Sequence, residues 1–184
     1  MENIIENAKN YAISCHRNTN HFYDDKPYEV HLNMVFNEAL NFIGLIKEVD
    51  GFDSNINNFL AAAWVHDVIE DCRETYNDVL KATNKEVADL AYALTNEKGK
   101  NRKERASDKY YEDMKNVSHA VLLKVCDRIA NLKYSISTNS RMLKVYIDEN
   151  TNFCESLYQA KYATAFNVLN HLTNHYNKKI KKWK

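Results

Sequence analysis

The stretch "AAAWVHDVIED" (Ala61–Asp71) changes from an apolar run to a group of one histidine and three acids. Its apolar first part is typical of a buried helix. At about 100° per residue, His66 and Glu70 share one face of such a helix, and Asp67 and Asp71 lie on the adjacent stripe. Burying these four groups without partners would be costly. A bound divalent cation removes this cost, because imidazole and carboxylate groups together suit Mn, Fe, Co or Zn.

The composition of the chain predicts an all-α fold around this stretch. The 184 residues are 45% hydrophobic, which is enough for the core of one domain. Three glycines and one proline offer little material for tight turns, so a sheet of any size is not expected. Because no internal repeat, low-complexity tract or domain boundary stands out, we expect a single helical domain over residues 1–184.

Charge and cysteine usage restrict the partners and the compartment that we expect. Lys+Arg 25 and Asp+Glu 25 give a net charge of +0, which offers no electrostatic basis for broad binding to nucleic acid or to an anionic membrane. No apolar run approaches the roughly 18 residues of a membrane helix. The four cysteines are far apart, and the first residues lack an apolar segment. We expect a soluble, reduced, cytoplasmic protein, and its oligomeric state stays open.

Apolar positions recur every three or four residues along nearly the whole chain, which predicts a stack of helices. Pro27 suits the first turn of the second helix, and Gly51 and Ser54 mark a turn and an N-cap before the third. Residues 96–108 are polar and basic and are expected to form a loop. Residues 159–184 should hold the last helix and a basic tail without a function. The expected helices cover residues 2–15, 27–49, 55–70, 74–83, 84–95, 109–116, 117–138, 141–149 and those from about 152 onward.

Two of these expected helices offer further ligands for a metal. Asp127 interrupts an apolar core stripe, and Lys124, Arg128 and Asn131 fall within about 100° of it around the helix. His31 lies on a core-facing pattern of the second helix. Taken alone, His31 would be interpreted as a core histidine with a hydrogen-bond partner.

The segments "KPYEVH", "AAAWVHDVIED", "NKEVADLAYALT" and "LLKVCDRIANL" together resemble the HD-domain hydrolases of the RelA/SpoT type, including the small alarmone hydrolases. The match runs from about residue 8 to residue 158 and implies an HD-type helical bundle. It implies that Glu70 and Asp71 are the catalytic acid pair. One metal is expected, because no histidine lies between Asp67 and His119, where binuclear HD proteins have extra histidines. The implied ligands of one Mn²⁺, or of another divalent transition metal, are His31, His66, Asp67 and Asp127.

The resemblance implies a metal-dependent nucleotide hydrolase that removes the 3′-pyrophosphate from the guanosine nucleotide (p)ppGpp. A metal ion so held lowers the pKa of its bound water and polarises a phosphoryl oxygen, and the two acids would orient that water and handle protons. Asn131 and Tyr146 match positions of the nucleoside pocket. The candidate cations for phosphate binding are Lys98, Arg102, Lys103, Arg105, Lys124 and Arg128.

The sequence departs from this family at two places. The family usually has a basic segment before its "PY" turn, whereas this chain has "NTNHFYDDK", with His21 and Phe22 where cations are expected. Ala130 replaces a histidine of the family motif. We therefore keep two alternatives, another HD nucleotide phosphohydrolase such as a 5′-nucleotidase, and a non-catalytic helical module that binds a nucleotide or a protein. The intact ligands and acid pair favour the enzyme.

Overall fold

The computed structural model describes residues 3–51, 56–96 and 99–182 and confirms the all-α class. The strands β1 and β2 form a small antiparallel hairpin in which Phe22 pairs with Pro27. The elements are α1 Ile4–Asn18, β1 Phe22–Tyr23, β2 Lys26–Pro27, α2 Glu29–Asn41, α3 Ile43–Asp50, α4 Ile56–Val65, α5 Val68–Asp71, α6 Tyr76–Ala82, α7 Lys85–Leu94, α8 Arg102–Arg105, α9 Asp108–Lys115, α10 Ala120–Thr138, α11 Met142–Leu157, the 3₁₀ helix η1 Ala160–Tyr162 and α12 Ala163–Lys182.

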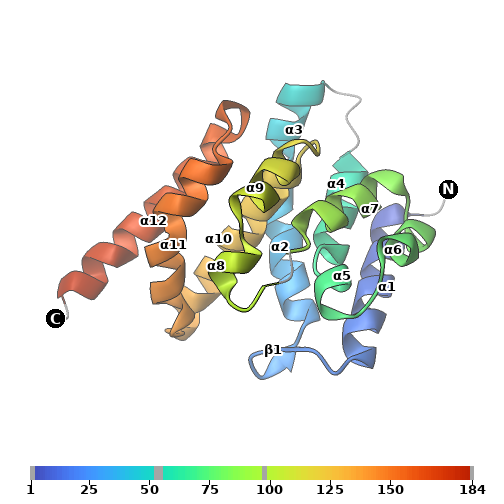
Figure 1. Cartoon of the computed structure of the whole chain (residues 1–184), viewed down its shortest axis with the longest axis horizontal. Coiled ribbons are helices and arrows are strands. Elements are labelled where there is room, and N and C mark those ends of the chain that lie inside the picture. The colour runs from blue at the N-terminus through green and yellow to red at the C-terminus, as the bar shows by residue number, and fades with distance from the viewer. Residues whose placement is uncertain (1–2, 52–55, 97–98, 183–184) are drawn as a thin grey trace.

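The helices pack around a centre made by α2, α4 and α10 (Figure 1). Helix α2 contacts both α4 and α10, and α1 covers α4 from the other side. Helices α11 and α12 pack on α10 at the opposite end of the molecule, near the C-terminus. One continuous apolar core runs through these contacts. The three segments that carry the predicted metal ligands therefore lie in the middle of the fold.

Helix α4 owes its central position to its small residues. Ala61, Ala62 and Ala63 are each 0% exposed, and Phe59 and Val65 are buried beside them. Because alanine adds little bulk, neighbouring helices can approach this segment closely. Burial of every side chain from Asn58 to Val65 places the residues that follow, His66 and Asp67, at the edge of the core.

Two predictions for the second helix, its start and its continuity, are wrong. The second helix is interrupted at Phe42, where the backbone N–H donates to the carbonyl of Ala39, only three residues back, and a separate helix, α3, begins at Ile43. Pro27 belongs to β2 and does not open α2. Gly51 ends α3 with a φ of 85°, which favours glycine, so the predicted turn is confirmed there. Ser54 lies outside the described residues.

The C-terminal boundary differs from the prediction as well. Helix α11 continues beyond residue 149 to Leu157, and α12 begins only at Ala163. The polar residues "DENTN" lie where the prediction separated two helices, but in the structure they belong to one continuous helix. Tyr146, Phe153 and Leu157 are all buried, at spacings of seven and four residues, so the apolar face continues without interruption.

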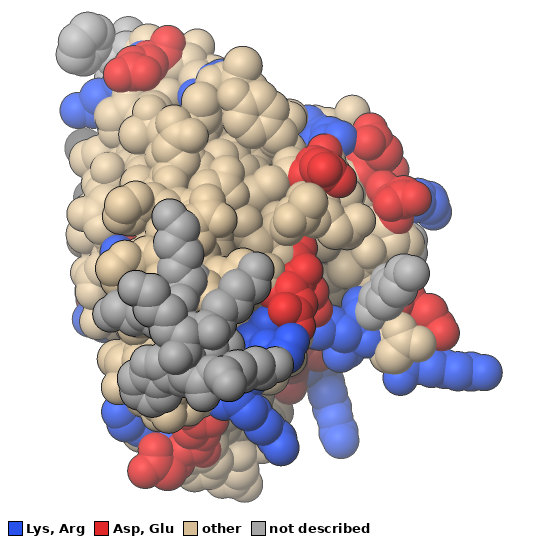
Figure 2. All heavy atoms as spheres, turned by 90° about the vertical axis from the view of Figure 1, so that its left-hand side faces the viewer, with Lys and Arg blue, Asp and Glu red and all other residues tan. Residues whose placement is uncertain are grey.

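The surface mixes charges of both signs. Figure 2 shows the end of the molecule on which α11 and α12 lie, where acidic and basic side chains lie beside one another around a broad area without Lys, Arg, Asp or Glu. Among the described residues, no helix combines the length and the hydropathy that crossing a lipid bilayer requires.

Candidate metal centre

His31 enters the site from the first turn of α2. Its ring is 1% exposed, and Tyr23 stacks on it with the ring centroids 4.8 Å apart. Its Nε2 atom lies 3.4 Å from Oδ2 of Asp67 and 3.4 Å from Oδ1 of Asp127. One nitrogen of a core histidine therefore faces two carboxylates from two other segments.

His66 lies where the predicted third helix breaks, between the end of α4 at Val65 and the start of α5 at Val68. Its Nδ1 atom is 3.0 Å from the carbonyl oxygen of Ala63, which can only accept, so Nδ1 carries the hydrogen and donates it. This contact satisfies one of the last carbonyl groups of α4, which lack backbone partners at a helix end. The neutral ring then presents the lone pair of Nε2 to the interior of the site.

This Nε2 atom of His66 is an unsatisfied polar atom of the cluster, as is Nδ1 of His31. It is buried and has no hydrogen-bond partner, although Oδ2 of Asp67 lies only 3.0 Å away. Oδ1 of Asp127 is 4.0 Å from the same nitrogen. A lone pair facing carboxylate oxygens in a buried place is unfavourable unless a cation lies between them.

The two aspartates are held by their own neighbours. The hydroxyl of Tyr28 donates to Oδ2 of Asp67 at 2.6 Å. The side-chain amide of Asn131 donates to Oδ1 of Asp127 at 2.5 Å, and Nζ of Lys124 lies 3.2 Å from Oδ2. Such outer partners fix the direction in which a ligand points and are typical of metal sites.

The pKa values show that the cluster attracts positive charge. Burial lowers the pKa of His31, but the hydrogen bonds to Asp127 and Asp67 outweigh burial and raise this pKa to about 9. Burial raises the pKa of Asp67, but the neighbouring His66 and His31 hold it well below its ordinary value. Without a metal, His31 therefore stays protonated at neutral pH. Its positive charge then balances the two carboxylates, as a bound metal cation would.

These residues fit a divalent transition metal. Ligand atoms of His31, His66 and Asp67 lie within 4.8 Å of one another, and Asp127 faces the same space. Two imidazoles with two carboxylates are a donor set suited to Mn, Fe, Co or Zn. The arrangement does not indicate which of these metals is bound.

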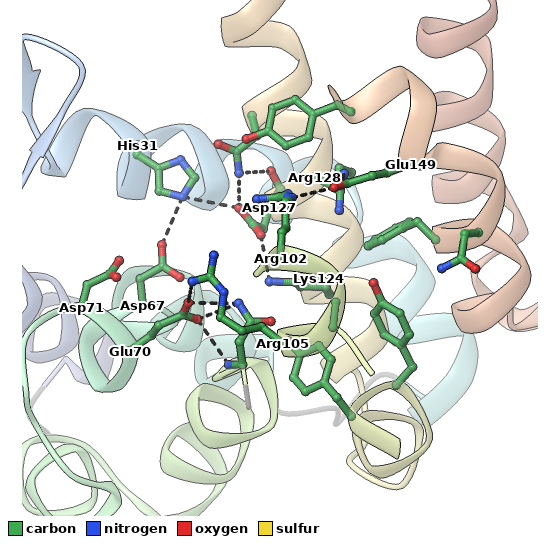
Figure 3. A pocket seen from close by; sticks show the side chains of 18 of the residues that line it. His31, Asp67, Glu70, Asp71, Arg102, Arg105, Lys124, Asp127, Arg128 and Glu149 are labelled. Atoms are coloured by element: carbon green, nitrogen blue, oxygen red, sulfur yellow. Dashed lines mark hydrogen bonds and ion pairs between the residues drawn. The ribbon is translucent and has the colours of Figure 1, made fainter. Parts of the chain in front are cut away.

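The predicted acid pair lies beside this cluster on α5 (Figure 3). Glu70 accepts hydrogen bonds from the backbone and side-chain nitrogens of Asn96 at 3.0–3.3 Å, and Arg105 lies 4.0 Å from it. The side chain of Asp71 is 30% exposed. Burial, with the charges of Asp67 and Glu70, raises the pKa of Asp71 to about 7.

A pocket of about 510 Å³ opens next to the cluster. In Figure 3, His31 and Asp67 lie on the left, Asp127 lies near the middle, and Glu149 lies toward the right. Its walls come from α2, α5, α8, α9, α10 and α11. The residues that line it are Tyr28, His31, Asp67, Glu70, Asp71, Asn96, Arg102, Arg105, Ala106, Tyr110, Tyr111, Lys124, Asp127, Arg128, Asn131, Tyr146, Glu149, Asn152 and Phe153.

The structure brings most of the predicted substrate-binding residues to this pocket. Asn131 and Tyr146 line it, as do four of the six predicted cations, which are Arg102, Arg105, Lys124 and Arg128. Lys98 lies outside the described residues, and the side chain of Lys103 is not described. Each of the four cations already lies beside an acid: Lys124 beside Asp127, Arg105 beside Glu70, and both Arg102 and Arg128 beside Glu149.

His21, which stands where the related family has a cation, takes part in an aromatic stack. Its ring lies 4.0 Å from that of Tyr28 between centroids, and its Nδ1 atom is 3.0 Å from Nδ1 of His16. The same Nδ1 atom is 3.8 Å from Oδ2 of Asp71. This segment therefore lies beside Asp71, and it does not supply the cation that the related family has at this position.

The sequence analysis did not identify four residues of the site, Tyr28, Asn96, Glu149 and His16. It also did not predict the hydrogen bond of Tyr23 to Asn131. Tyr28 was part of the "PY" turn, which was the one available signal. The other contacts join residues at least 21 positions apart, except for the His16–His21 pair, and no local pattern marks them.

Comparison with known proteins identifies no family for this site. No family model matches the chain, and no curated protein matches it.

Proposed function

We propose that this chain is a metal-dependent nucleotide phosphohydrolase of the HD type, and that it removes the 3′-pyrophosphate from (p)ppGpp. The observation that carries the proposal is the meeting of His31, His66, Asp67 and Asp127 at one end of a pocket lined by basic side chains. The resemblance of the separate sequence segments to HD hydrolases supports the same class of reaction.

The side chains around the cluster suit phosphate ester hydrolysis. A divalent cation bound there would polarise a phosphoryl oxygen and lower the pKa of bound water. Asp71, with its pKa of about 7, can exchange a proton near neutral pH. Glu70, whose carboxylate is fixed by Asn96, can orient the attacking water. Lys124, whose side chain is 14% exposed, lies beside Asp127 and can balance negative charge on the phosphate.

A nucleoside monophosphate is the second candidate substrate. Within the described residues, all the cations that line the pocket come from α8 and α10, and none comes from the segment before α2. Arg17, at the end of α1, forms an ion pair with Glu29 instead. A substrate with one phosphate needs fewer cations than an alarmone does, so this observation favours the 5′-nucleotidase alternative.

The experiment is to incubate the purified protein with Mn²⁺ and a nucleotide panel and to identify the products. The panel contains ppGpp, pppGpp, GTP, deoxynucleoside monophosphates and NADPH. The proposal predicts release of pyrophosphate from ppGpp. Efficient cleavage of a monophosphate with ppGpp left intact would replace the alarmone proposal by the nucleotidase. Absence of turnover on the whole panel, with Mn²⁺ bound, would favour the non-catalytic binding module.

A further inference from the structure

Glu149 on α11 brings two arginines together on the side of the pocket away from His31 and Asp67 (Figure 3). Its Oε1 atom is 2.7 Å from Nε of Arg102 on α8, and its Oε2 atom is 2.9 Å from Nη1 of Arg128 on α10. One carboxylate therefore lies between two guanidinium groups that come from different helices.

The two arginines are also held by aromatic rings. The guanidinium carbon of Arg128 lies 5.0 Å from the ring centroid of Tyr146 and 4.5 Å from that of Phe153. The guanidinium carbon of Arg102 lies 5.4 Å from the same Tyr146 ring. Cation–π contacts of this kind do not depend on Glu149, so the arginines keep support if its carboxylate moves away.

Burial differs between the partners. The side chain of Arg128 is 10% exposed, whereas that of Glu149 is 33% exposed at the pocket wall. The carboxylate engages one nitrogen of each guanidinium through two oxygens. A phosphate group has three terminal oxygens and a higher charge, so it can accept more of the charge-assisted hydrogen bonds that two arginines offer.

We propose that Arg102, Arg128 and Tyr146 form an anion-binding subsite, and that Glu149 occupies it as an internal competitor until a phosphate group of the ligand displaces it. The inference rests on the proposed function for the identity of the ligand, which would be a nucleotide with a second phosphate group away from the metal. Anion binding by the two arginines does not depend on hydrolysis and can be tested without metal.

The test measures binding of inorganic pyrophosphate by calorimetry to the full chain in the presence of a chelator. Glu149→Gln keeps the size of the side chain and removes the competing charge, so pyrophosphate should bind about tenfold more tightly. Adding Arg128→Gln to this variant should abolish the gain. The matched control is Asp148→Asn on the same helix, whose carboxylate forms an ion pair with Lys144 on the exposed side and whose loss should leave the affinity unchanged.

The subsite would be overturned by an unchanged pyrophosphate affinity in Glu149→Gln, by an equal gain in Asp148→Asn, or by a gain that persists without Arg128. Glu149→Asp, which withdraws the carboxylate by one methylene, should give a smaller gain. Loss of folding in both Glu149 variants would also overturn it, because the carboxylate would then be structural and not exchangeable. A gain in affinity without turnover of any nucleotide would refute the proposed function and leave the subsite standing.

Discussion

At the scale of single residues, His66 and His31 prepare the site in different ways. His66 donates one ring hydrogen to the carbonyl of Ala63, and this fixes its tautomer before any metal arrives. Nδ1 of His31 has no such partner, and Nε2 of the same ring faces the carboxylates of Asp67 and Asp127. Metal binding must therefore displace a proton from His31 but not from His66, and the metal affinity should fall as the pH is lowered.

The pKa of His31 gives a prediction for the metal-free chain. A pKa raised from 6.5 to about 9 contributes stability that is complete below pH 6.5 and is lost as the pH rises through 9. The free energy of unfolding should fall by on the order of 3 kcal/mol over this range. The lowered pKa values of Asp67 and Asp127 arise in part from the same ion pairs with His31, so they add no further free energy to this figure.

Urea unfolding at pH 6 and pH 9.5, with a chelator present, measures this loss. His31→Gln serves as the reference, because it has no titrating ring and should lose the pH-dependent part. An equal change in the free energy of unfolding between the two pH values in the wild type and in His31→Gln would contradict the assignment of a raised pKa to His31.

Glu70 is expected to act in the chemical step and not as a ligand. Glu70→Gln keeps the size of the side chain and its contact with Asn96 while removing the charge. Metal content should stay near that of the wild type, and turnover should fall by on the order of 10²-fold or more. Glu86→Gln, an exposed change on α7, is the control and should leave turnover unaltered. An undiminished rate in Glu70→Gln would show that Glu70 has no part in the chemical step and is only a polar residue of α5.

Tyr28 should tune the metal affinity through Asp67. Its buried hydroxyl donates to Oδ2 of Asp67, and loss of such an outer partner typically weakens metal binding by about 10- to 100-fold. Titration of Tyr28→Phe with Mn²⁺ measures the change. Tyr76→Phe removes a comparable hydrogen bond to Asp89 outside the site and should bind Mn²⁺ as the wild type does. Equal affinities for the two variants would show that the Tyr28 hydroxyl does not support the ligand.

At the scale of elements, the period of apolar residues predicted which segments are helical but not where they stop. The helix through Ala61–Ala63 was evident from its composition, whereas the period of apolar residues gives no sign of the break after Val65. The hairpin of β1 and β2 was missed because each strand has only two residues. The extension of α11 was missed because the five consecutive polar residues "DENTN" interrupt the apolar pattern along the chain.

Helix α8 links both ends of the pocket, because Arg105 lies beside Glu70 and Arg102 beside Glu149. The double change Arg102→Ala with Arg105→Ala should lower kcat/KM on ppGpp by roughly 10- to 100-fold for each charge-assisted bond lost, with a smaller effect on a monophosphate. Asn101→Ala removes the N-cap of α8 without changing charge and controls for displacement of the helix. Equal losses on both substrates would contradict a role for these arginines in binding the extra phosphates.

At the scale of the whole molecule, the candidate centre exists only because three packed segments meet. His31 comes from α2, His66 and Asp67 from the turn between α4 and α5, and Asp127 from α10. The sequence could place each residue on a helix face, but the meeting of the segments was implied only by the resemblance to HD hydrolases. The partners of the pocket cations could not be predicted, because they depend on contacts such as Arg102–Glu149 between residues distant in the chain.

The most direct test of the central claim is the metal content of the chain after loading with Mn²⁺ and desalting, measured by mass spectrometry of the elements. The wild type should retain about one ion per chain, and His66→Ala and Asp127→Ala should each lose it and unfold at a lower temperature, since a ligand removed leaves buried charge uncompensated. His175→Ala, an exposed change on α12, should keep the ion. Stoichiometric metal in both ligand variants, or none in the wild type, would contradict the account.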